Sequence, residues 1–258
     1  MTQDQKLRQL LDSYCQQLRR LGPAWLQLIG GQPDPLWQPS EELQSYLKSR
    51  FQWLNRRNEA ADDIGRRCRQ VTRGIYLARA ALDWDSPSVG STGPTADIRG
   101  EQWRVMMAWA GLEAVMGAVT KSSKDGHGIN KLVLEHACRF SEADLPDQLP
   151  APSSRLKKLQ EAREWPDEDG TPGMLVYLGL HRGFARDVLK DWLHAGTPLN
   201  SSVELLGCAQ AIRHATAHGA LSSSGIRNWG IRPALLPLTV TTAGVTCGLI
   251  RNLMNRAE

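Results

Sequence analysis

The sequence predicts an all-α protein, and two patterns support this prediction. Apolar residues recur at spacings of three and four along most of the 258 residues, which is the period of an amphipathic helix. No stretch shows the sustained apolar-polar alternation of a half-buried strand. Because 41% of the residues are hydrophobic, the chain can bury a core and is expected to be globular.

The composition permits a nucleic-acid partner and indicates a reducing compartment. The net charge of +4 is compatible with RNA binding but does not require it. The cysteines are odd in number, far apart and never in Cys-x-x-Cys spacing: they are Cys15, Cys68, Cys138, Cys208 and Cys247. This pattern predicts reduced thiols in a cytoplasmic protein, not a disulfide framework or a zinc site. The segment MTQDQKLRQLL at the start also lacks the apolar run of a signal peptide.

The first predicted element is a helix over 4–21. Its apolar residues follow helical spacing: they are Leu7, Leu10, Leu11, Tyr14 and Leu18. The pair Gly22-Pro23 is expected to end this helix. The following segment, LIGGQPDPLWQPS, is rich in turn-forming residues and predicts a connector.

A second helical stretch is predicted from Ser40 to Trp84, with a break at 55–59 as an alternative. Ser40 is a favourable N-cap, and the two glutamates after it suit the positive end of the helix dipole. Arginines occur throughout the stretch, at positions 56, 57, 66, 67, 69, 73 and 79. A solvated helix face is the simpler interpretation of these arginines, and an RNA-facing strip is the alternative.

The segment DSPSVGSTGPTAD, at 85–97, has the composition of a linker. We therefore predict an N-terminal helical region of unknown role over 1–85, a linker over 86–97 and a second domain over 98–258. In the second domain, helices are predicted over 99–121, 128–140, 154–164, 175–193, 200–219 and 235–256, with loops between them. Asn200 or Ser201 can cap the fifth of these helices, and Gly219 can close it.

The last of these helices includes a segment that could be mistaken for a membrane span. Residues 233–250, PALLPLTVTTAGVTCGLI, carry no charge and are nearly long enough to cross a bilayer. The segment also contains prolines, threonines and glycines, and no other part of the chain resembles a span. We predict a buried core helix with no membrane contact. A membrane role and a strand are the alternatives.

The segment AIRHATAHGAL, at 211–221, brings Arg213, His214 and His218 together near a predicted helix end. Residues five apart on an ideal helix differ by about 140°, so Arg213 and His218 do not share one face. They can still converge on one ligand, because arginine is long and a terminal turn is distorted. A histidine can transfer protons near neutral pH, and an arginine can hold a phosphate and stabilise its developing charge. As a bare pattern the pair has little specificity, and two histidines that simply finish a helix are the structural alternative.

This segment and one further upstream resemble the HEPN superfamily. IRHATAHG is similar to the superfamily signature, in which an arginine, a polar residue and a short spacer of small residues precede His-Gly. RVMMAWAGLEAVMG resembles the first core helix of such domains, where an aromatic residue precedes a Leu-Glu pair. The resemblance covers roughly residues 99–256. It implies a HEPN-like helical bundle, here with a helical N-terminal extension that the resemblance does not explain.

The resemblance implies a metal-independent RNA endonuclease without a cofactor, in which two protomers form one composite site. The ribose 2′-hydroxyl attacks the adjacent phosphate and leaves a 2′,3′-cyclic end. His218 matches the histidine that transfers the proton, and Arg213 matches the arginine that binds the phosphate. His214 takes the polar position after the arginine. Glu113 is expected either to orient Arg213 or to support the fold from within the core.

The resemblance also suggests partners, and it leaves a second function open. Many HEPN proteins are toxins or defence proteins, with an antitoxin or nucleotidyltransferase partner. Some toxins carry a tyrosine two residues after the histidine, which such a partner modifies. This chain has Ala220 there, so regulation of that type is in doubt. The alternative function is a non-catalytic module that binds a nucleotide, RNA or a protein, and a structural subunit with tryptophans at an interface is a third possibility.

Other candidate sites are weaker. KSSKDGHGINK, at 121–131, places glycines before a helix, as some phosphate-binding loops do. It lacks P-loop spacing, and we predict an ordinary loop. His181 and His194 have no partners at metal-ligand spacing and are expected to be surface or core histidines.

Overall fold

The computed structural model describes residues 2–31, 33–51, 61–84, 95–120, 129–140, 149–152, 175, 178–180 and 183–255. These ranges contain helices and no strand, apart from one isolated bridge between Leu149 and Leu199. The all-α prediction is therefore confirmed. The predicted helix at 154–164, most of the predicted linker and the glycine-rich loop before residue 129 lie outside the described residues.

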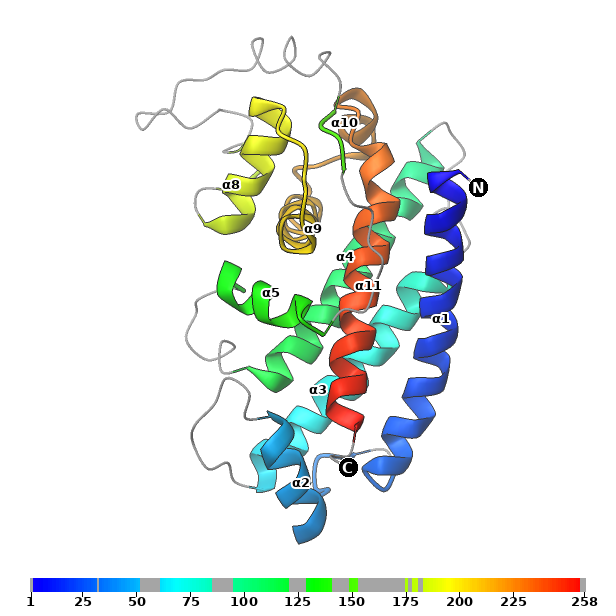
Figure 1. Cartoon of the computed structure of the whole chain (residues 1–258), viewed down its shortest axis with the longest axis vertical. Coiled ribbons are helices and arrows are strands. Elements are labelled where there is room, and N and C mark those ends of the chain that lie inside the picture. Colours follow the sequence, from blue (N-terminus) through cyan, green and yellow to red (C-terminus); the bar gives the residue numbers. More distant parts are fainter. Residues whose placement is uncertain are drawn as a thin grey trace.

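Four long helices pack along the long axis of the molecule (Figure 1). They are α1 (Gln3–Leu28), α3 (Ala61–Leu82), α4 (Ala96–Val119) and α11 (Arg232–Met254). The shorter elements are α2 (Glu41–Phe51), α5 (Lys131–Cys138), α8 (Phe184–Lys190), the π-helical turn η1 (Asp191–Ala195), α9 (Ser202–Ala217) and α10 (Ser223–Asn228). Helix α9 contacts α4, α5, α8 and α11 and is seen end-on in Figure 1, so it runs across the long helices.

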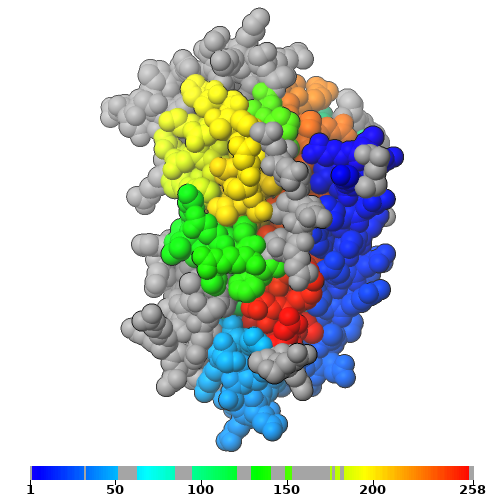
Figure 2. Space-filling view, in the orientation of Figure 1, coloured from blue at the N-terminus to red at the C-terminus, as the bar shows by residue number. Residues whose placement is uncertain are grey.

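Helix α11 is the central helix of the core. Among the described residues it is the one helix long and apolar enough to cross a membrane, but 89% of its most apolar 18-residue stretch is buried inside the protein. It packs against α1, α4 and α9, and its C-terminal end reaches the surface between α1, α2 and α5 (Figure 2). A helix that is apolar on all sides is typical of a protein interior. The prediction of a buried core helix is confirmed, and the strand alternative is wrong.

The polar groups of α11 are largely satisfied within the helix itself. The hydroxyls of Thr239, Thr242 and Thr246 donate to carbonyls four residues earlier, at distances of 2.7–2.9 Å. This bond lets threonine enter an apolar core without losing its hydrogen bond. These three threonines therefore replace apolar side chains at little cost, whereas the buried hydroxyl of Thr241 has no hydrogen-bond partner among the described residues.

Helices α3 and α4 make the closest contact in the bundle, through two glycines. A Cβ added to Gly74 would lie 2.8 Å from the Gly111 carbonyl oxygen, and one added to Gly111 would lie 2.7 Å from the Ala78 backbone nitrogen. The two backbones therefore touch at positions where a side chain has no room. This contact joins α3 to α4, and one continuous hydrophobic core extends from Leu7 to Leu253.

The first helix does not end at Gly22-Pro23 as predicted, because α1 continues through Pro23 to Leu28. Trp25 and Ile29 lie beyond the proline and are 0% and 1% exposed. The indole Nε1 of Trp25 also donates to Thr72 Oγ1 on α3 at 3.0 Å. The burial of these two side chains offsets the backbone hydrogen bond that a proline removes from a helix.

Three other boundaries differ from the predictions. The helix predicted over 175–193 is interrupted, because Gly179 and Gly183 take the left-handed region, with φ of 74° and 100°, and α8 begins at Phe184. The predicted loop before the last helix contains the short helix α10. Helix α4 begins at Ala96, so the last two residues of the predicted linker are helical. The Ser40 hydroxyl does cap α2, because it accepts from the Leu43 amide at 3.3 Å.

The arginines of α3 have separate roles. Arg67 is buried and donates to the Ala118 carbonyl at the end of α4. Arg66 pairs with Asp63 at 3.0 Å, and Arg69 donates to the Asp34 carbonyl at 3.0 Å. Several of the arginines predicted to be solvated are thus used to hold neighbouring segments. Positions 56 and 57 lie outside the described residues.

Asp83 fastens α1 to the end of α3. Its carboxylate accepts from Cys15 Sγ at 2.8 Å, from Arg19 Nη2 at 2.6 Å and from Arg79 Nε at 3.2 Å. The hydrogen bond from the Cys15 thiol, followed by those from the two arginines, lowers the pKa of Asp83 despite its partial burial. Burial and the neighbouring carboxylate raise the pKa of Cys15 to about 11. All five cysteines are free, as predicted.

The glycine contact between α3 and α4 can be tested with a matched pair of substitutions. We expect Gly111→Ala to destabilise the protein by about 1–3 kcal/mol, because its Cβ would meet backbone that cannot move aside. Gly117→Ala is the control on the same helix, since its Cβ would meet nothing closer than Gln70 Nε2 at 3.9 Å. Urea denaturation measures both. Equal stabilities for the two variants would contradict the close contact.

The Asp83 network predicts a pH-dependent contribution to stability. Because its folded-state pKa is lowered, the network stabilises the protein above the unfolded pKa of about 4 and loses this effect as the pH falls through the folded pKa. We expect Asp83→Asn to cost about 1 kcal/mol at pH 7, and the difference from the parent to shrink below about pH 4. Thermal melts from pH 3 to 7 measure it, with Asp63→Asn as the control for an exposed pair. A difference independent of pH would rule out the carboxylate as its source.

Candidate active site

The C-terminal end of α9 forms an open surface site with a well-defined backbone. The Ser201 hydroxyl caps the start of α9 by accepting from the Glu204 amide at 3.2 Å. At the other end Gly219 adopts φ +71°. The Ala220 amide donates to the Ala215 carbonyl at 2.9 Å, and the Gly219 amide donates to the Thr216 carbonyl at 3.0 Å. These two bonds make a Schellman motif, so the predicted closure by Gly219 is confirmed.

His218 occupies the last position before this glycine and is exposed. Within the described part of the chain, neither of its ring nitrogens has a hydrogen-bond partner. Its ring packs at a tilt of 53° against the ring of His214, with 4.4 Å between the centroids. The imidazole of His218 is therefore supported on one side and open to solvent for proton transfer.

His214 is held in place by a neighbouring turn. Its Nε2 lies 3.1 Å from the Gly179 carbonyl oxygen. Since a carbonyl only accepts, this nitrogen carries the proton. Gly179 has φ +74°, and a Cβ there would lie 3.4 Å from the same nitrogen. The 178–180 turn therefore fixes the tautomer and orientation of His214, which in turn supports His218.

Arg213 is linked to α4 through Glu113. Arg213 Nη2 lies 3.3 Å from Glu113 Oε2, and the two side chains are 34% and 46% exposed. Glu113 thus lies on the surface, and the expectation that it supports the fold from within the core is wrong. Its neighbours in the sequence, Trp109 and Leu112, face the core instead. Glu113 can orient the guanidinium while leaving part of it open to solvent.

Gln102, which the sequence analysis missed, holds the end of α9 against α4. It is 3% exposed, and its Nε2 donates to Thr216 Oγ1 at 2.7 Å and to the Leu221 carbonyl at 2.6 Å. Its Oε1 accepts from the Ser223 hydroxyl at 3.2 Å. Gln102 lies on the apolar face of α4 between Ile98 and Val105. A single polar residue in such a register is the signal that could have identified it.

The four predicted site residues therefore form two separate contacts in the structure, one between Arg213 and Glu113 and one between His214 and His218. Arg213 and His218 do not hydrogen-bond to each other. They lie five residues apart at the C-terminal end of α9, where the guanidinium is partly exposed and the imidazole is exposed. Such a pair can bind a phosphodiester and transfer a proton beside it.

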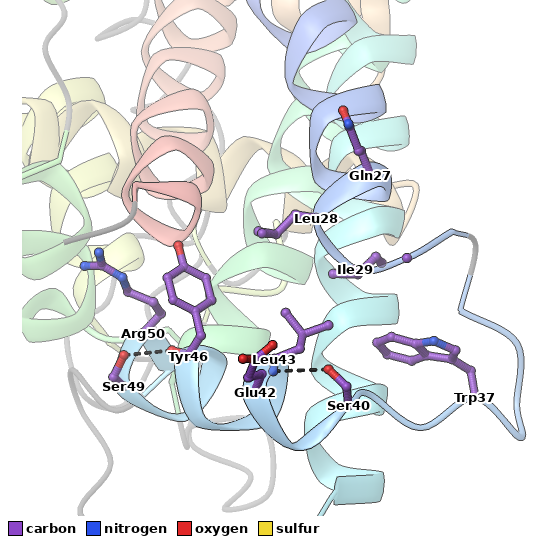
Figure 3. A pocket seen from close by; sticks show the side chains of 11 residues that line it. Gln27, Leu28, Ile29, Trp37, Ser40, Glu42, Leu43, Tyr46, Ser49 and Arg50 are labelled. Atoms are coloured by element: carbon purple, nitrogen blue, oxygen red, sulfur yellow. Dashed lines mark hydrogen bonds between the residues drawn. The ribbon is translucent and has the colours of Figure 1, made fainter. Parts of the chain in front are cut away.

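A hollow lies elsewhere, between the end of α1, the connector and α2 (Figure 3). Its volume is about 890 Å³. Most of its polar side chains already have partners: Ser40 caps α2, Tyr46 donates to the Leu253 carbonyl at 2.9 Å, Ser49 donates to the Tyr46 carbonyl, and Arg50 donates to the Asn255 carbonyl. The bonds of Tyr46 and Arg50 hold α2 to the C-terminal end of α11. The hollow contains none of the predicted site residues.

The weaker candidates add no second site within the described residues. His194 lies in η1, and its Nδ1 is buried without a partner. His127 and His181 lie outside the described ranges. No cluster of three or more His, Cys, Asp or Glu residues with the geometry of a metal site occurs in the part of the chain that the structure describes.

The closure of α9 by Gly219 can be tested by substitution. A Cβ at Gly219 would meet nothing within 4 Å, so the only expected penalty is backbone strain at φ +71°. We expect Gly219→Ala to lower the free energy of unfolding by about 1–2 kcal/mol. Gly219→Asn should lose less, because asparagine tolerates the left-handed region. Calorimetry measures both, and an alanine variant as stable as the parent would show that this turn is not left-handed.

No protein-family model, curated protein or solved structure matches this chain.

Proposed function

We propose that this protein is a metal-independent RNA endonuclease that cleaves through Arg213 and His218. The observation that carries the proposal is the state of His218. Its imidazole is exposed, lacks a hydrogen-bond partner among the described residues and packs against a second histidine that is itself anchored. A histidine that only completed a helix would be expected to bond to nearby carbonyls, as His214 does.

The proposed reaction assigns one role to each side chain. The ribose 2′-oxygen forms a bond to phosphorus, and His218 accepts the 2′-hydroxyl proton. The bond between phosphorus and the 5′-oxygen breaks, and the departing oxygen takes a proton from water or from protonated His218. Arg213 binds the non-bridging oxygens and stabilises the charge that develops on them. The products are a 2′,3′-cyclic phosphate and a 5′-hydroxyl.

The resemblance to HEPN proteins supplies the setting of the proposal. In that superfamily two copies join their motif helices, and we extend this to a homodimer in which the ends of two α9 helices meet. Five free thiols suit a cytoplasmic location. A toxin or defence role, with an antitoxin or nucleotidyltransferase partner, fits such an enzyme. Ala220 argues against control through a modified tyrosine.

A second candidate function is a non-catalytic module that binds RNA or a nucleotide. The ion pair between Arg213 and Glu113 favours it, because the carboxylate competes with a phosphate for the guanidinium. A catalytic site must release part of that pairing when substrate binds. Under the binding alternative the pair persists, and the same surface binds RNA without cleaving it.

Substitution of the two site residues tests the catalytic proposal. We expect His218→Ala to lower the cleavage rate by at least about 100-fold, through loss of proton transfer. Arg213→Ala should lower it about 100- to 1,000-fold, through loss of charge stabilisation. The assay follows a labelled RNA in excess EDTA and identifies the cyclic phosphate at the new end.

Arg20→Gln on α1 is the matched control, because it removes an exposed arginine far from α9. Circular dichroism confirms that each variant is folded. A folded His218→Ala protein that cleaves as fast as the parent would refute the assignment of the site. Tight RNA binding by the parent without any cleavage would favour the non-catalytic module.

A further inference from the structure

An aromatic residue and a cation lie open on the first turns of α4, close to the end of α9. Trp103 is 42% exposed, while Trp25, Trp109 and Trp192 are at most 1% exposed. Arg99 is exposed, and its guanidinium has no partner among the described residues. The two side chains are four residues apart, so they lie about 40° apart on the same helix face.

Gln102 fixes the position of the α4 turn that carries Arg99 and Trp103 relative to the candidate active site. It lies between Arg99 and Trp103, and its side chain bonds to Thr216 and Leu221, which lie on either side of His218. The turn of α4 that carries Arg99 and Trp103 is therefore packed against the turn that carries His218. Glu113, the partner of Arg213, lies about 40° from Arg99 around the helix, so it belongs to the same face of α4.

The charges of this turn leave the open face positive. Asp97 and Glu101 lie about 160° around α4 from Arg99. Glu101 pairs with Arg232 on α11 through two contacts of 3.2 and 3.3 Å. These bonds to Glu101, together with the negative charge of Asp97, raise the pKa of Arg232. The acids are thus directed to α11, and Glu113 is paired with Arg213. Among the described residues no ion pair compensates the charge of Arg99, which lies one turn from the exposed indole of Trp103.

We propose that Trp103 and Arg99 form a nucleotide-binding platform for single-stranded RNA next to His218. An RNA base stacks on the indole of Trp103, and a neighbouring phosphate pairs with Arg99. This inference rests on the proposed function, because it describes how the substrate reaches that site. Base stacking on an exposed aromatic beside a cation is a common way to bind a single strand.

The platform selects single strands for a physical reason. A base can stack on Trp103 only where its face is free, and in a duplex both faces are covered by neighbouring bases. The indole stacks on the face of any base and Arg99 is assigned to a phosphate, so neither contact depends on the identity of the base. The platform therefore predicts affinity for unpaired RNA with little sequence preference.

Binding of a non-cleavable RNA tests the platform apart from catalysis. The probe is a fluorescein-labelled 12-nucleotide 2′-O-methyl RNA, which lacks the attacking hydroxyl, and binding is followed by anisotropy. We expect Trp103→Ala to weaken binding about 5- to 150-fold and Trp103→Phe to retain most of it. Arg99→Gln should weaken binding less and lower the slope of log affinity against log salt by about 1. Tyr76→Ala on α3, where the tyrosine is 48% exposed, and Arg20→Gln should bind like the parent.

The possible outcomes separate the platform from the proposed function. Loss of binding in Trp103→Ala supports the platform, even if the parent cleaves no RNA and the catalytic proposal fails. Unchanged binding in a folded Trp103→Ala protein overturns the platform, even if the His218→Ala result supports catalysis. Equal affinity of the parent for duplex and single strand, or no RNA binding at all, also overturns it. A Trp103→Ala variant that binds RNA normally but loses self-association in sedimentation would identify this face as a subunit contact instead.

Discussion

Helix α11 has no charged side chain between Arg232 and Arg251, so other helices must cover all of its faces. Most other elements of the fold help to meet this requirement. Helices α1, α4 and α9 pack directly on α11, and α2, α3 and α5 contact it as well. Thr239, Thr242 and Thr246 of α11 satisfy their hydroxyls within the helix, so they need no polar partner from the surrounding elements. The core is therefore shared between the N-terminal helices and the remainder of the chain.

This arrangement determines where polar chemistry is possible. Helix α4 directs two of its sides inward, against α3 and α11, and the glycine contact with α3 leaves no space there. Its outer face remains available to α9 and to solvent. Gln102 and Glu113 join α4 to the C-terminal half of α9. Arg213, whose side chain is 34% exposed, and the exposed His218 consequently lie where the C-terminal turn of α9 reaches the surface.

The sequence alone could predict the elements that depend on local patterns. The helical class, the capping of α9 by Asn200 or Ser201, its closure by Gly219 and the burial of α11 all follow from periodicity, capping and charge. Features that depend on tertiary packing could not be predicted. Pro23 signals a helix end, yet α1 continues because Trp25 is buried beyond it. The register of α4 places Trp109 in the core and Glu113 on the surface. This difference could be predicted only if the positions of α3 and α9 against α4 were known. The contacts of His214 with Gly179 and of Gln102 with Leu221 join segments far apart in the sequence.

The central claim is that the open end of α9 binds the scissile phosphate. A crystal structure with a dinucleotide whose first ribose is 2′-deoxy tests it most directly, because this substrate analogue binds but cannot be cleaved by attack of a 2′-hydroxyl. We expect the phosphate to lie within hydrogen-bond distance of Arg213 and of the His218 ring, with the guanidinium turned partly away from Glu113. A dinucleotide bound in the hollow between α1 and α2, with Arg213 still fully paired to Glu113, would contradict it.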